Sequence, residues 1–83
     1  MKNVHLYVTV AIKEAIKGSF QIRDFVVSFM EDDPPNLDIL KEGDDSKTMD
    51  KIFVRLPLEE HNFLRERFGG PSGLSRAIVS YYG

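Results

Sequence analysis

Residues 51–57, KIFVRLP, place two cations and an aromatic ring at alternate positions. Lys51, Phe53 and Arg55 fall on one side of an extended chain, because successive side chains of a β-strand point to opposite faces. The ammonium and guanidinium groups donate hydrogen bonds to anions and to the acceptor atoms of nucleic-acid bases, whereas the phenyl ring offers an apolar contact. This face is suited to a base-paired or anionic partner, provided that the opposite face of the strand is buried.

An apolar side opposite these residues would bury the strand and leave the cations outside. Ile52, Val54 and Leu56 provide that side, and Pro57 ends the strand because it has no N–H to donate. A single strand is not stable in water, since both of its edges lack hydrogen-bond partners. No second strand pattern follows, so the simplest partner is the same strand of another copy, paired antiparallel about a two-fold axis.

Two helices are predicted after this strand. Residues 58–68, LEEHNFLRERF, favour a helix that ends at the glycine pair 69–70, where a left-handed conformation stops it. Ser72 is the expected N-cap of a second helix that continues to residue 82. Apolar residues recur at helical spacing in both segments. The side chains expected to pack the helices against the strand, or two copies together, are Phe63, Leu64, Phe68, Leu74, Ile78 and Tyr81.

With one strand followed by two helices, residues 50–83 resemble the ribbon-helix-helix DNA-binding domains of the Arc, MetJ and CopG type. The resemblance rests on the strand alternation, the RLP junction, the GGPSG turn and the terminal IVSYY helix. It implies an α+β fold in which two chains form a homodimer through an antiparallel two-stranded ribbon. It also implies a cytoplasmic transcription regulator, typically a repressor, that inserts the ribbon into the major groove of double-stranded DNA and is nucleoid-associated when bound.

Carried onto this chain, the family's three base-contacting strand positions fall on Lys51, Phe53 and Arg55. Arginine and lysine bond O6 and N7 of guanine. Phe53 is a departure, because a polar side chain is more common there, and it would contact thymine methyl groups or pack against the protein. The family also anchors a DNA phosphate at the N-terminus of its second helix, which implies Ser72 and the amide of Gly73. Without DNA, the two strand cations would be solvated charges that discourage aggregation.

Residues 1–30 predict a small N-terminal α/β element. Residues 4–10 alternate as a strand, and residues 11–18, AIKEAIKG, favour a short helix. Residues 19–30, SFQIRDFVVSFM, form either a second helix with Ser19 as its cap or the second strand of a hairpin. Residues 31–49 are rich in Asp and Glu and contain two prolines, which is typical of a linker. The C-terminal domain then covers residues 50–83.

Three interpretations of the whole chain remain open. In the first, residues 1–46 bind a partner protein, as in an antitoxin or a partition protein, and residues 50–83 bind DNA. In the second, the likeness of GSFQIRDFVVSFM to GPSGLSRAIVSYY indicates a degenerate second copy of the strand-helix-helix unit. The chain would then be a single-chain pseudo-dimer whose N-terminal strand offers either His5, Tyr7 and Thr9 or its reverse face. In the third, the C-terminal unit only dimerises the chain and binds no DNA.

The composition argues against several other classes of function. The net charge is −2, but residues 47–83 carry six basic and four acidic side chains, so any anion-binding surface is expected there. The chain has no cysteine, and its two histidines lie in different predicted elements, so no metal or cofactor is expected. No phosphate-binding loop or nucleophile motif is present, and no enzymatic activity is expected. No apolar run approaches the roughly 20 residues of a membrane helix.

Overall fold

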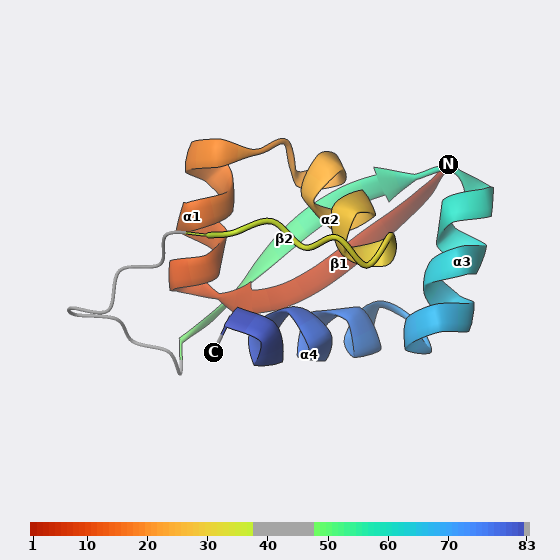
Figure 1. Ribbon diagram of the computed structural model, residues 1–83. Coiled ribbons are helices and arrows are strands. Elements are labelled where there is room, and N and C mark those ends of the chain that lie inside the picture. Colours follow the sequence, from red (N-terminus) through yellow and green to blue (C-terminus); the bar gives the residue numbers. More distant parts are fainter. Residues whose placement is uncertain (38–47, 83) are drawn as a thin grey trace.

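The computed structural model describes residues 1–37 and 48–82, which are organised as two units with the same order of elements (Figure 1). The first unit consists of β1 (Lys2–Thr9), α1 (Val10–Ser19) and α2 (Ile22–Met30). The second unit consists of β2 (Met49–Leu56), α3 (Leu58–Phe68) and α4 (Pro71–Tyr82). The fold is therefore α+β, with two strand-helix-helix units in a single chain.

β1 and β2 pair with each other as an antiparallel two-stranded sheet, with His5 opposite Phe53 and Leu6 opposite Ile52. Antiparallel pairing gives the two strands an approximate local two-fold axis, and each strand is followed by two helices. The partner of residues 51–56 is thus the N-terminal strand of the same chain, which corrects the two-chain ribbon expected from the C-terminal sequence. The hairpin alternative for residues 19–30 is also wrong, because that segment contains α2.

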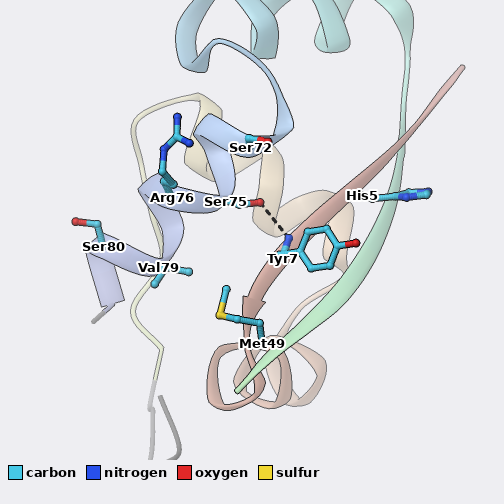
Figure 2. A pocket seen from close by; sticks show the side chains of 8 residues that line it. All are labelled: His5, Tyr7, Met49, Ser72, Ser75, Arg76, Val79 and Ser80. Atoms are coloured by element: carbon cyan, nitrogen blue, oxygen red, sulfur yellow. Dashed lines mark hydrogen bonds between the residues drawn. The ribbon is translucent and has the colours of Figure 1, made fainter. Parts of the chain in front are cut away.

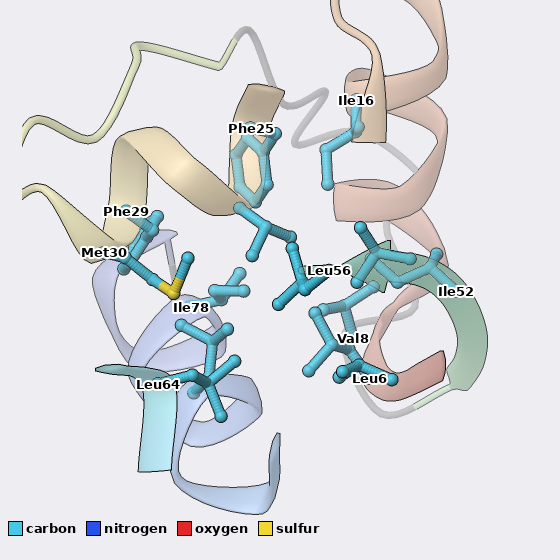
Figure 3. Close-up of a cluster of buried hydrophobic side chains, with 14 of the residues drawn as sticks. Leu6, Val8, Ile16, Phe25, Phe29, Met30, Ile52, Leu56, Leu64 and Ile78 are labelled. Carbon is cyan, nitrogen blue, oxygen red and sulfur yellow. The ribbon is translucent and has the colours of Figure 1, made fainter. Parts of the chain in front are cut away.

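Both units contribute to one hydrophobic core on a single side of the sheet (Figure 3). The apolar strand residues that alternate towards this side are at most 5% exposed: Val4, Leu6, Val8, Ile52, Val54 and Leu56. The helices cover them with buried aliphatic and aromatic side chains: Ile12, Ile16, Phe25, Val26, Phe29, Met30, Leu64, Leu74 and Ile78. One unit alone would leave its strand edge unpaired and half of this core in water. The two units therefore fold as one body.

α1 begins directly after β1 because Thr9 caps it. The Thr9 backbone is extended, and its Oγ1 accepts a hydrogen bond from the N–H of Ile12 at 3.2 Å. This bond lets the chain pass from strand to helix without a loop. Ser19, the expected cap of the second helix, is instead the last residue of α1, and Gln21 precedes α2 without a side-chain capping bond.

The turn between α3 and α4 depends on glycine at three positions. Gly69 and Gly70 have φ angles of 77° and 123°, which side chains with a Cβ rarely adopt. Gly73 lies against the end of α3, and a Cβ there would be 1.7 Å from the carbonyl oxygen of Phe68. The sequence GGPSG is thus explained by the backbone path, which brings the start of α4 against the end of α3.

Three residues differ from the positions predicted by capping preference or helical spacing. Ser72 is not an N-cap, because α4 begins one residue earlier and Ser72 lies in its first turn. Phe63 is 41% exposed, since Leu64 faces the core and neighbouring helical positions are rotated by about 100°. Tyr81 is 56% exposed and contacts the ring of Phe29 edge-on, with 5.6 Å between centroids.

The segment after α2 is tied to the C-terminal helix. The hydroxyl of Tyr82 donates a hydrogen bond to the carbonyl oxygen of Pro35. Burial, reinforced by the neighbouring Tyr81, raises the pKa of Tyr82 to about 12, so its hydroxyl stays protonated. Of the predicted acidic linker, residues 38–47 lie outside the described part of the chain.

Candidate functional site

On the side of the sheet opposite the core, three cross-strand pairs lie before the terminal Thr9–Met49 pair and form one surface. We call it the ribbon face, and it consists of Asn3, His5, Tyr7, Lys51, Phe53 and Arg55. Five of them are exposed, and Lys51 is partly buried. The helices pack on the other side of the sheet because the period of two sends the valine, leucine and isoleucine residues of both strands there. The three strand residues singled out from the sequence therefore lie together, and three residues of β1 join them.

The six side chains form three cross-strand pairs of unlike chemistry. At one end of the ribbon face, Tyr7 lies opposite Lys51, whose Nζ is 5.7 Å from the ring centroids of both Tyr7 and Phe53. In the middle, the rings of His5 and Phe53 meet edge-on, with 4.7 Å between centroids. The structure thus gives Phe53 a protein contact, although its side chain remains 59% exposed.

Asn3 and Arg55 lie opposite each other at the other end of the ribbon face. Within residues 1–37 and 48–82, neither side chain has a hydrogen-bond or ion-pair partner. An amide and a guanidinium that are exposed and unpaired keep their full donor and acceptor capacity for a ligand. This end differs from the Tyr7–Lys51 end, where the cation is held over two rings.

The ribbon face carries no carboxylate among its six residues, although an aspartate precedes Lys51. Asp50 is directed away from this face and pairs with Lys13 of α1, with 3.0 Å between Nζ and Oδ2. The hydrogen bond from Lys13, helped by the backbone N–H of Lys51, lowers the pKa of Asp50. Its negative charge is therefore offset by Lys13 and does not oppose an anion bound at the ribbon face.

An open groove of about 590 Å³ runs between the strands and α4, beside the ribbon face (Figure 2). The strands line it with Tyr7 and Met49, and α4 lines it with Ser72 and Arg76, which are four residues apart and so share one side of the helix. Ser75 fixes its width, because its Oγ accepts a hydrogen bond from the N–H of Tyr7 at 3.0 Å. α4 is thereby pinned to the outer edge of β1.

The N-termini of α4 and α2 differ in charge, although they hold equivalent places in the two units. The first turn of α4 contains no acidic residue, and Arg76 stands one turn further along. The first turn of α2 contains Asp24, and its Arg23 is paired with Glu60 of α3 at 2.9 Å. The positive end of a helix dipole attracts anions when no acidic group opposes it. The α4 end is therefore the better anion site.

The sequence reasoning missed several residues of this region. Asn3 was left out because the strand was expected to begin at Val4, although the KNVHLYV pattern extends the alternation by one step. Ser75 gave a weaker signal, a small polar residue on the apolar side of a helix. Thr9, offered as an outward residue in the pseudo-dimer interpretation, is 6% exposed and caps α1.

Comparison with protein-family models, with curated proteins and with solved structures found no match to this chain. Within residues 1–37 and 48–82, no group of three or more acidic or histidine side chains is placed to hold a metal ion. In the same residues, every helix is too short or too polar to cross a membrane.

Proposed function

We propose that this chain is a sequence-specific DNA-binding regulator of the ribbon-helix-helix type, in which the two units of one chain take the place of two subunits. The observation that supports this most is the ribbon face, an exposed antiparallel two-stranded surface without carboxylates, with the valine, leucine and isoleucine residues of both strands buried on the other side. A two-stranded ribbon fits the major groove of B-DNA, where side chains on its outer face meet the base edges.

The chemistry of the ribbon face suits base contacts. The guanidinium of Arg55 can donate two hydrogen bonds to O6 and N7 of one guanine, and the Asn3 amide can pair with N6 and N7 of adenine. Lys51 supplies a second cation. The rings of Phe53 and His5 would face the base pairs in the DNA major groove, where thymine methyl groups are the apolar contact available.

The groove beside the ribbon face suits the sugar-phosphate backbone. A duplex seated on the ribbon face would bring a phosphate towards the first turn of α4, where Ser72 and the amide of Gly73 lie and where Arg76 adds a positive charge. Such contacts position a protein on DNA without specifying sequence. Ser75 contributes indirectly, because it holds α4 at the edge of β1.

The test is DNA binding by wild-type protein, Arg55→Ala and Arg65→Ala, using duplexes selected from a randomised pool. Both substitutions remove one exposed arginine, but Arg65 lies on α3 and outside the ribbon face. Arg55→Ala is expected to weaken binding to the selected duplex by about 1–3 kcal/mol, and Arg65→Ala to leave it nearly unchanged. Equal effects of the two substitutions, or no selected duplex, would contradict the proposal.

Salt dependence separates phosphate contacts from base contacts in the same assay. The logarithm of the binding constant should fall linearly with the logarithm of the salt concentration. Arg76→Ala should weaken binding to selected and random duplexes alike and reduce the magnitude of this slope by about one. A slope that Arg76→Ala leaves unchanged would exclude the groove as a phosphate site.

A protein-binding module is the second candidate. Tyr7, Met49 and Phe53 are 51%, 47% and 59% exposed, and together they form an apolar area across the ribbon face and the adjoining groove. Exposed apolar areas of this kind commonly mark protein contacts. This candidate predicts that Phe53→Ala abolishes partner binding while Arg55→Ala has little effect, which is the reverse of the order expected for DNA.

A further inference from the structure

We infer that the DNA site of this chain lacks two-fold symmetry, with Asn3 and Arg55 specifying one end of the site and Lys51 and Tyr7 contacting the other. This inference rests on the proposed function and adds the class of DNA that is recognised. It also assigns base contacts to β1, which the resemblance of residues 50–83 does not cover.

The difference between the two ends follows from the pairing register of β1 and β2. In a ribbon made from two identical strands, antiparallel pairing gives both ends the same pair of residues. Here the approximate two-fold axis relates Asn3 to Lys51 and Tyr7 to Arg55, because His5 and Phe53 form the central pair. The amide of Asn3 in β1 thus takes the place of the Lys51 ammonium in β2. The phenol of Tyr7 takes the place of the Arg55 guanidinium. The two ends of the ribbon face cannot make the same base contacts.

The Asn3–Arg55 end is the one suited to specify sequence. Both side chains are exposed and lack partners within the described residues. Asparagine and arginine are the side chains that form bidentate hydrogen bonds with adenine and guanine. Since Asn3 and Arg55 lie directly opposite each other, they would contact neighbouring base pairs. We therefore expect an adenine and a guanine close together at this end of the site.

The Tyr7–Lys51 end is suited to hold DNA with less discrimination. Lys51 is partly buried and lies over the rings of Tyr7 and Phe53, so its ammonium group is already engaged. The groove with Ser72 and Arg76 adjoins Tyr7. The equivalent place in the first unit carries Asp24 and the Arg23–Glu60 ion pair, which disfavour a phosphate. Backbone anchoring is thus expected along the β1 edge alone.

The experiment is selection from a randomised duplex pool with wild type, Asn3→Ala, Arg55→Ala and the control Arg65→Ala. The wild type should enrich a motif without two-fold symmetry, bound by one chain per duplex. Arg55→Ala should relax one guanine position and lower affinity about tenfold to a hundredfold, and Asn3→Ala should relax one adjacent adenine. Circular dichroism of each variant checks that these exposed substitutions leave the fold intact.

A second variant tests the asymmetry directly. The triple substitution Asn3→Lys, His5→Phe and Tyr7→Arg gives β1 the same ribbon-face residues as β2, and all three positions are exposed. This variant should enrich a two-fold-symmetric motif in place of the wild-type motif.

A palindromic wild-type motif in which Arg55→Ala relaxes two symmetry-related positions overturns the inference and leaves DNA binding standing. The same holds for two chains per duplex. Failure of the wild type to enrich any motif overturns the proposed function and the inference with it.

Discussion

Replacing Ser75 with alanine tests the contact that joins α4 to β1. Ser75 is 9% exposed, and its Oγ accepts the hydrogen bond of the Tyr7 N–H at 3.0 Å across 68 residues of sequence. That N–H is directed away from β2, so no other acceptor is available to it within the sheet. The bond is partly buried, and removing the partner of such a donor costs at most about 1–3 kcal/mol.

The helix propensity of alanine opposes part of this loss. Alanine is better than serine in a helix by about 0.5 kcal/mol, so the net destabilisation by Ser75→Ala should be about 1–2 kcal/mol. Ser80→Ala is the matched control, because Ser80 is exposed on the same helix and gains only the propensity. The difference between the two variants isolates the hydrogen bond.

Urea denaturation gives the free energy of unfolding, and amide hydrogen exchange reports on Tyr7 itself. We expect Ser75→Ala to lower the urea midpoint and to speed exchange at the Tyr7 amide, while Ser80→Ala does neither. If the two variants are equally stable and the Tyr7 amide stays protected, the contact does not hold α4, and the groove beside the ribbon face has no fixed width.

Two further predictions concern the turn and the C-terminal helix. Gly73→Ala should destabilise the protein by several kcal/mol in thermal or urea denaturation, because its Cβ would clash with Phe68. The control Gly18→Ala, whose Cβ would meet no atom within 4 Å, should be neutral or stabilising by up to about 1 kcal/mol. Similar free energies of unfolding for the two variants would refute the close approach of α3 and α4. The pKa of Tyr82 is raised from its ordinary value to about 12, so its contribution to stability should be complete below about pH 10 and lost as pH rises through 12. Tyr82→Phe should remove that alkaline loss of stability and the late step in the ultraviolet absorbance titration; an unchanged late step would assign the raised pKa to another tyrosine.

Local sequence patterns predicted the elements of the second unit well. Ile52, Val54 and Leu56 alternate strictly, Pro57 ends the strand, and the pair Gly69–Gly70 separates the two helices, as the structure has them. Each of these signals acts within a few residues, through side-chain alternation or a restricted φ angle. The residues of the ribbon face on β2 follow from the same alternation, and so they could be named in advance.

The strand partner could not be predicted in the same way. The apolar side of β2 is equally well matched by a second copy of itself and by the Val4–Leu6–Val8 side of β1, and neither pattern says which one pairs. Chain connectivity decides, because a strand in the same chain is present at an effective concentration of the order of millimolar. A second copy would have to exceed that concentration to compete. From the sequence, the ribbon-face residues of β1 could therefore be predicted only within the pseudo-dimer interpretation.

Packing outside the strands was harder still. Glu60 occupies a position of α3 where the helical pattern favours an apolar residue. In the structure it forms an ion pair with Arg23 of α2, which joins the two units. Phe63 and Tyr81 have helical spacing that suits a core, but their helices turn neighbouring residues towards it. Successive residues of a helix are rotated by about 100° about its axis, so an error of one position moves a predicted side chain from the core to solvent.

The covalent joining of two strand-helix-helix units changes what each substitution can do. In a homodimer every ribbon residue appears twice, so improving one contact alters both ends of the DNA site together. Here Arg55 and its counterpart Tyr7 are separate positions, and in the proposed DNA complex the Asn3–Arg55 end would supply base contacts while Ser72 and Arg76 on the α4 side would contact phosphate. Under the proposed function the α2 side needs no phosphate site, and it carries Asp24 and the Arg23–Glu60 pair instead. The differences between the units thus fall on the residues that two-fold symmetry would otherwise force to be identical.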